Sequence, residues 1–132
     1  MEVIVLAAGQ GKRMRSVLPK VLQPLAAKPM LGHVLDTART LEARRIVVVY
    51  GHEGEVVREA LDAPDLAWAR QDPPQGTGHA VQQAMPLVED GDTALILYGD
   101  VPLIGVPTLQ RLMGASGESR LALLTVHMSD PT

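Results

Sequence analysis

The stretch that decides the fold is an apolar run that leads directly into a basic, glycine-containing loop. It reads Val3-Ile4-Val5-Leu6-Ala7-Ala8-Gly9-Gln10-Gly11-Lys12-Arg13-Met14-Arg15-Ser16-Val17-Leu18-Pro19-Lys20. The run is rich in β-branched residues, which predicts a buried strand. Gly9 and Gly11 permit the positive φ angles that direct several backbone N–H groups toward one point. We therefore expect a strand followed by a loop that can surround an anion.

The loop is basic although the chain as a whole is acidic. Lys12, Arg13, Arg15 and Lys20 fall within nine positions with no acid among them, whereas the formal net charge of the chain is −3. Cations gathered beside accessible backbone N–H groups favour a polyphosphate ligand. The alternative is a tight turn after the strand whose cations are simply solvated.

Two common phosphate loops do not fit this stretch. The dinucleotide fingerprint needs a third glycine, but Met14 stands at that position, and Pro19 interrupts any long helix. A Walker A loop needs Ser or Thr after Gly-Lys, but Arg13 follows Lys12, and the upstream glycine is missing.

The composition is that of one globular domain with a core. The 132 residues are 46% hydrophobic and 20% charged, with no Phe, two Tyr and one Trp. The scarcity of aromatic residues argues against nucleic-acid binding by base stacking. The absence of Cys excludes thiolate metal sites and disulfides and suits a cytoplasmic protein. Neither a signal peptide nor a membrane-spanning stretch is expected.

Strand and helix patterns alternate along the chain. We expect strands at 3–6, 45–50, 66–69, 93–98 and 121–126, and helices at 30–41, 53–62, 77–88 and 106–113. Nearly continuous apolar strands separated by helices indicate an α/β fold, a mostly parallel sheet with helices on both faces. Ligands of such sheets bind beyond the carboxyl ends of the strands. The loops after Leu6, Ala69 and Tyr98 are therefore the candidate site.

The second of these loops reads Arg70-Gln71-Asp72-Pro73-Pro74-Gln75-Gly76-Thr77-Gly78-His79-Ala80. The amide of Gln71 offers one acceptor and two donors, the complement of a pyrimidine edge. Thr77 is a candidate cap for the following helix, and His79 can stiffen the loop. A surface glutamine beside an ordinary helix entry is the alternative, and the spacing does not separate the two.

The third loop reads Tyr98-Gly99-Asp100-Val101-Pro102-Leu103. A carboxylate at the end of a buried strand can bind Mg²⁺ together with phosphate oxygens. A single Asp at this position can equally be a turn residue or a helix cap.

Taken together, the three motifs resemble the sugar-nucleotidyltransferase superfamily, whose signature is L-A-A-G-x-G-x-R-M followed by P-K. The additional segments Q-x-x-x-x-G-T-G-H-A and L-Y-G-D-V-P-L resemble the uridyltransferase domain of the bacterial bifunctional N-acetylglucosamine-1-phosphate uridyltransferases/glucosamine-1-phosphate acetyltransferases. The resemblance implies a Rossmann-like nucleotide-diphospho-sugar transferase fold. It also implies Arg13 and Lys20 as catalytic residues and Asp100 as the Mg²⁺ ligand. The nucleotide contacts that it implies are Leu6, Ala7, Ala8, Gly9, Lys20, Gln71, Gly76, Thr77, Tyr98, Gly99 and Asp100.

The implied reaction joins UTP and N-acetylglucosamine 1-phosphate to give UDP-N-acetylglucosamine and pyrophosphate, a step toward peptidoglycan and lipopolysaccharide. Family domains continue well beyond Thr132, so residues 1–132 are expected to be the N-terminal, nucleotide-binding part. The sugar-binding remainder and the left-handed β-helix that carries acetyl transfer and trimerisation are expected to lie outside this chain.

Three rival functions stay open at this point. The first is another sugar-1-phosphate or cytidylyl nucleotidyltransferase, and the second is a nucleotide-binding module without catalysis. The third is a fragment of a dinucleotide-dependent oxidoreductase, which the missing third glycine disfavours.

Overall fold

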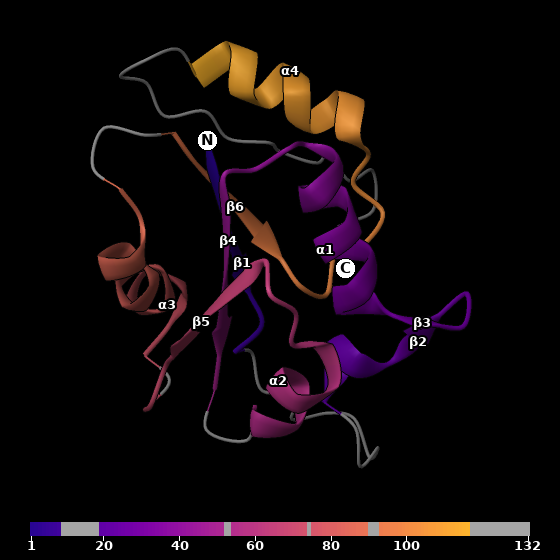
Figure 1. Ribbon diagram of the computed structural model, residues 1–132, viewed down its shortest axis with the longest axis vertical. Coiled ribbons are helices and arrows are strands. Elements are labelled where there is room, and N and C mark those ends of the chain that lie inside the picture. The colour runs from indigo at the N-terminus through magenta and orange to yellow at the C-terminus, as the bar shows by residue number, and fades with distance from the viewer. Residues whose placement is uncertain (9–18, 52–53, 74, 90–92, 117–132) are drawn as a thin grey trace, which may run out of the picture.

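The computed structural model describes residues 1–8, 19–51, 54–73, 75–89 and 93–116 (Figure 1). The described part contains four long strands, a short two-stranded ribbon, four α-helices and two 3-10 turns. In chain order these are β1 (Glu2–Leu6), η1 (Lys20–Leu22), β2 (Pro24–Leu25), β3 (Lys28–Pro29), α1 (Met30–Thr40), β4 (Arg45–Tyr50), α2 (Glu55–Leu61), β5 (Leu66–Arg70), α3 (Thr77–Ala84), η2 (Met85–Leu87), β6 (Ala94–Tyr98) and α4 (Val106–Ser116).

The long strands form one parallel sheet in the order β5-β4-β1-β6. β1 lies inside the sheet, with Val3 opposite Ile46 of β4 on one side and Leu95 of β6 on the other. The chain first adds β4 and β5 outward from β1, and then returns past them to place β6 on the opposite side. The expectation of an α/β fold with a mostly parallel sheet is confirmed.

Helices cover both faces of the sheet, and the alternation of side chains along β1 explains this arrangement. Val3 and Val5 pack on the face that contacts α1, α2 and α4, whereas Ile4 and Leu6 pack on the face that contacts α3. Figure 1 shows α3 on the opposite side of the sheet from α1. Because β1 is apolar on both faces, every residue of it is buried.

The strand β6 is the exception, since only one of its faces is covered. Leu95 and Leu97 are buried, but Ile96 is 41% and Tyr98 48% exposed on the other face. Within the described residues, β6 pairs only with β1. It is therefore an edge strand with a partly apolar open face.

Two expected elements end differently in the structure. The helix expected over 77–88 stops at Ala84 and continues as the 3-10 turn η2, which contains Pro86. Proline has no N–H to continue the helical ladder. The helix expected over 30–41 begins at Met30 and ends at Thr40, and Pro29 before it, with φ −54° and ψ 143°, belongs to the ribbon of β2 and β3. The strand expected at 121–126 lies outside the described residues.

An acidic residue lies unexpectedly inside the amino-terminal end of the sheet. Glu2 is fully buried, and its Oε2 accepts a 2.9 Å hydrogen bond from the backbone N–H of Glu89. Nε of Arg45 lies 3.8 Å from the other carboxylate oxygen. The carboxylate thus joins β1 to the segment that leads into β6, and the guanidinium of Arg45 on β4 offsets its negative charge.

Among the described helices, none is both long enough and apolar enough to cross a membrane.

Candidate functional site

The carboxyl ends of β1 and β6 form the edge at which the two halves of the sheet diverge. The N–H of Gly99 donates a 2.9 Å hydrogen bond to the carbonyl of Leu6, and the N–H of Ala7 donates a 2.8 Å bond to Val49. The chain leaving β1 is thereby held between β4 and β6. In open α/β sheets, this divergence point is where ligands bind.

Gly99 is favoured at this edge because the neighbouring atoms would crowd a side chain. A Cβ at this position would lie 3.2 Å from the carbonyl oxygen of Leu6, 3.2 Å from Cδ1 of Leu31 and 3.3 Å from Cγ1 of Val21. The tight approach places the residue after Gly99 directly beside the chain that leaves β1. That residue is Asp100.

Asp100 and Lys20, predicted from separate motifs, lie together in the structure. Nζ of Lys20 is 3.2 Å from Oδ2 of Asp100, and the two side chains are 48% and 34% exposed. Lys20 opens η1, whose buried residues Val21 and Leu22 fix it to the core beneath. The pair thus presents a cation and an anion, both accessible, at the end of β6.

The donor set around Asp100 fits a hard cation with one protein ligand. No group of three or more His, Cys, Asp or Glu side chains able to hold a metal is found among the described residues. Mg²⁺ commonly takes one or two carboxylates and completes its coordination with water and phosphate oxygens. Asp100 can therefore contribute to a Mg²⁺ site in the presence of a phosphate ligand, but it is not a complete site alone.

A second polar cluster follows β5 along the same edge. Gln71 is 3% exposed, and its backbone N–H donates a 2.8 Å hydrogen bond to the carbonyl of Tyr50. Its side-chain Nε2 donates a 3.0 Å bond to the carbonyl of Gly76 and lies 3.0 Å from Nδ1 of His79. The alternative of a surface glutamine is wrong. Both amide hydrogens have partners within the protein, so the side chain does not offer two donors to a ligand.

The entry to α3 differs from the expectation for Thr77. Gly76 is the residue before the helix, with φ +93° and ψ 176°, and Thr77 is already the first helical residue without a capping hydrogen bond from a side chain. Only glycine adopts this φ without strain, so Gly76 is needed at this position for its backbone.

The remaining predicted residues differ in their burial, and two of them lie outside the described residues. Leu6 and Ala7 are buried, Ala8 is half-buried, and Tyr98 is 48% exposed on the open face of β6. Gly9 and Arg13 lie outside the described residues. Because β5 and β6 are three strand spacings apart, Gln71 and Asp100 are separated by roughly 14 Å along the edge.

The sequence analysis did not single out Arg70, a further cation at this edge. Arg70 ends β5, and its guanidinium lies 3.5 Å from Asp72 and 3.7 Å from Glu55. Both acids form ion pairs with Arg70, which favours a structural role for this residue. The signal in the sequence would have been a cation in the last position of a buried strand.

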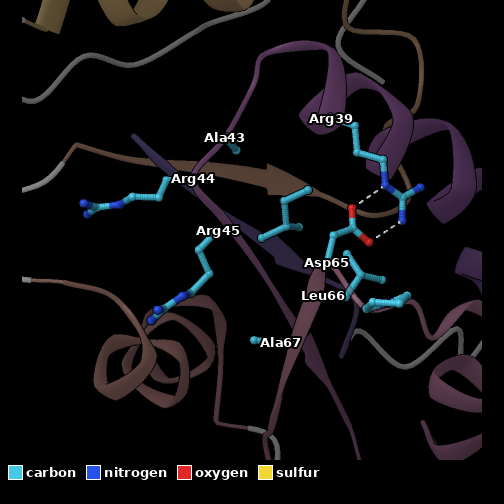
Figure 2. Close-up of a pocket in the computed structure, with 9 residues that line it drawn as sticks. Arg39, Ala43, Arg44, Arg45, Asp65, Leu66 and Ala67 are labelled. Carbon is cyan, nitrogen blue, oxygen red and sulfur yellow. Dashed lines mark hydrogen bonds and ion pairs between the residues drawn. The ribbon is translucent and has the colours of Figure 1, made fainter.

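A cavity of about 490 Å³ lies at the opposite, amino-terminal end of β4 and β5 (Figure 2). Arg39 bounds it on one side, donating 2.7 Å and 3.1 Å hydrogen bonds to the two carboxylate oxygens of Asp65. Arg44 and Arg45 extend away from that pair in Figure 2, and both pair with other acids, Glu89 and Glu2. The cavity is therefore remote from the divergence edge and offers no unpaired cation to an anionic ligand.

The fold, an open parallel α/β sheet with polar loops at its divergence edge, defines a Rossmann-like nucleotide-binding class. A family model described as the MobA-like NTP transferase domain matches residues 3–130. The chain belongs to this family, and the resemblance inferred from its motifs is confirmed.

Curated relatives that match the whole chain carry the name bifunctional protein GlmU. The chain is 79% identical over all 132 residues to the bifunctional protein GlmU of Azoarcus sp. strain BH72, and 66% identical to that of Aromatoleum aromaticum. It spans 29% of the length of each of these relatives.

Solved structures share the fold. Rv0371c from Mycobacterium tuberculosis matches with a TM-score of 0.76 and 27% identity, over 86% of this chain and 59% of that one. A nucleotidyl transferase from Methanothermobacter thermautotroptrophicus matches with a TM-score of 0.73 and 26% identity, over 86% of this chain and 56% of that one.

Proposed function

We propose that this chain is the nucleotide-binding part of a uridyltransferase that makes UDP-N-acetylglucosamine and pyrophosphate from UTP and N-acetylglucosamine 1-phosphate. The observation that carries the proposal is the Lys20–Asp100 pair beside Gly99, at the divergence edge of the sheet. The similarity over the whole chain to bifunctional GlmU proteins supports this substrate pair.

A nucleoside triphosphate fits the layout of the edge. Its base would lie at the Gln71–Gly76 cluster after β5, and its phosphates would reach the pair after β6, roughly 14 Å away. The small residues Ala7 and Ala8 lie between these two points, at the end of β1. A compact anion such as sulfate would engage only the second point.

The chemistry needs no general base from the protein. The attacking sugar phosphate is already an anion at neutral pH, so the barrier lies in charge repulsion and alignment. Arg13 and Lys20 would neutralise the phosphates of the two substrates, and the backbone of Leu6 to Gly9 would hold the nucleotide. Mg²⁺, when bound, supplies charge stabilisation on the phosphate oxygens of the leaving pyrophosphate.

The Lys20–Asp100 ion pair keeps both side chains paired at the divergence edge before the phosphates and the metal ion bind. In the absence of ligand, each side chain neutralises the other across 3.2 Å. When a nucleotide binds with its cation, Lys20 would turn to the phosphates and Asp100 to the metal, so neither charge is left unpaired.

The direct test is calorimetric titration of the 132-residue chain with UTP in the presence of Mg²⁺, with CTP and NAD⁺ as controls. We expect UTP to bind and NAD⁺ not to bind. If no nucleotide binds to a chain shown by circular dichroism to be folded, the proposal fails for this chain. Preference for CTP would favour a cytidylyl enzyme, and binding of NAD⁺ would favour an oxidoreductase.

Substitutions of Lys20 and Asp100 measure the contribution of each charge to UTP affinity separately. Lys20→Ala removes a charge-assisted contact worth about 1.5–3 kcal/mol, so UTP affinity should fall by about 10- to 100-fold. Asp100→Asn keeps the size of the side chain and should abolish the Mg²⁺-dependent part of the affinity. Asp65→Asn, at the opposite end of the sheet, is the matched control and should leave UTP affinity unchanged. Equal affinities for all four proteins would remove Lys20 and Asp100 from the site.

A further inference from the structure

The orientation of the Gln71 amide is determined by its two partners within the protein. The carbonyl of Gly76 can only accept a hydrogen bond, so the amide atom 3.0 Å from it must be the nitrogen. The same nitrogen lies 3.0 Å from Nδ1 of His79. One hydrogen therefore points to Gly76 and the other to His79.

This arrangement also fixes the state of His79. Because Gln71 donates to Nδ1, that ring nitrogen must be unprotonated, and the hydrogen of the neutral ring resides on Nε2. Gln83, one helical turn later, has its amide nitrogen 3.2 Å from Nε2. The same nitrogen of Gln83 lies 3.4 Å from the carbonyl oxygen of His79. Both amides cannot donate to one neutral ring, and the two contacts of Gln71, each 3.0 Å, are shorter than the two of Gln83. Rotation of the Gln83 amide therefore gives up only the longest contact and places its oxygen opposite the Nε2–H.

The amide oxygen of Gln71 is left as the group available to a ligand. Its position is fixed once the nitrogen is fixed, because the amide is planar, and it accepts no hydrogen bond from the residues that the structure describes. An acceptor held in this way pairs with an N–H and is repelled by a lone pair. The imide N3–H of uracil meets this requirement, whereas N3 of cytosine carries a lone pair.

We infer that His79 is a specificity-determining positioning residue that holds the amide oxygen of Gln71 toward the ligand and so favours a base with an imide N–H over cytosine. The inference about base selection rests on the proposed nucleotide site. The tautomer of His79 and the orientation of the Gln71 amide, in contrast, concern only the protein. His79 acts through Gln71 and has no contact with the reacting phosphates in this mechanism.

The first measurement tests the tautomer of His79 without any ligand. Long-range ¹⁵N correlation spectra of the histidine rings at about pH 8, where free imidazole is neutral, report which ring nitrogen carries the hydrogen. We expect His79 as the Nε2–H tautomer. A spectrum showing the Nδ1–H tautomer would overturn the inference whether or not the chain binds nucleotides.

The second measurement compares UTP and CTP affinity in matched variants, each checked for folding by circular dichroism. His79→Phe keeps a ring but removes the acceptor, and the preference for UTP should fall by about tenfold, the loss of one hydrogen bond. His79→Asn keeps an oxygen near the position of Nδ1 and should restore most of the preference. Gln83→Leu leaves Nδ1 untouched and should change the preference by less than about twofold.

The two hypotheses can fail separately. An unchanged UTP preference in a folded His79→Phe chain would overturn the role of His79 while leaving the proposed function intact. If the wild-type chain binds neither nucleotide, the proposed site fails and the inference about base selection fails with it. The tautomer would then describe a structural network only.

Discussion

At the scale of single residues, two glycines of the candidate site have opposite surroundings. Gly99 is enclosed by Leu6, Leu31 and Val21 at 3.2–3.3 Å from an added Cβ, whereas nothing lies within 4 Å of one added at Gly78. Both glycines belong to motifs that the sequence analysis selected, but of the two only Gly99 is closely packed. The difference depends on neighbours distant in the sequence.

We expect Gly99→Ala to lower the free energy of unfolding by about 1–3 kcal/mol, the usual cost of overpacking a close-fitting position. The backbone oxygen of Leu6 cannot move away without disturbing β1. Gly78→Ala is the control, and should be neutral or stabilising by up to about 1 kcal/mol because Ala favours the helix more than Gly does. Urea denaturation measures both variants. Equal effects would contradict the packing argument.

At the scale of elements, ion pairs join segments that the sheet leaves apart. Arg39, near the end of α1, binds Asp65, which precedes β5, and a further contact of 3.3 Å links Arg39 to Asp36. The hydrogen bond from Arg39 holds the pKa of Asp65 below its usual value of 3.8, and Lys28 in the same way lowers the pKa of Asp36. Both carboxylates favour the folded state only while they are ionised.

The pH dependence follows from these lowered pKa values. The stabilisation is fully present above the unfolded pKa, near 4. It is lost as pH falls through the lower pKa of the folded state. Asp65 is 47% exposed, so Asp65→Asn should destabilise the chain by less than about 1 kcal/mol at pH 7. The difference between variant and wild type should vanish in strong acid. Denaturant titrations at several pH values measure it, and a difference independent of pH would exclude the ionic explanation.

At the scale of the whole molecule, β6 is an edge strand of the described sheet with a partly apolar, exposed face. Ile96 and Tyr98 are exposed on one face of β6, and within the described residues the strand has a neighbour on one side only. Apolar edge strands invite pairing with other chains. The relatives, of which this chain spans 29%, contain further chain in addition to this region.

We expect the isolated chain to self-associate as its concentration rises. Ile96→Thr keeps the β-branched shape but adds a hydroxyl on the exposed face, so it should reduce association while retaining the fold. Light scattering coupled to size-exclusion chromatography over a range of concentrations measures this. Val101→Thr, which alters a residue of similar exposure outside the strand, is the control. A strictly monomeric wild-type chain would show that the edge does not pair.

The sequence by itself determined the fold class, and it predicted the edge of the sheet at which the candidate site lies. The apolar runs at 3–6 and 45–50 are continuous because a parallel sheet covered on both faces buries every residue, and that pattern is local. Lys20, Gln71 and Asp100 could be selected because cations, amides and carboxylates that follow strands collect at one edge.

Only the tertiary structure decided how these residues meet. The strand order β5-β4-β1-β6 brings Asp100 to Lys20, and the turn at Gly76 buries Gln71 against His79 and uses both of its amide hydrogens. The burial of Glu2 and the enclosure of Gly99 likewise depend on residues far along the chain. Local patterns specify which face of an element is apolar, but contacts between elements depend on packing and topology, which no short stretch encodes.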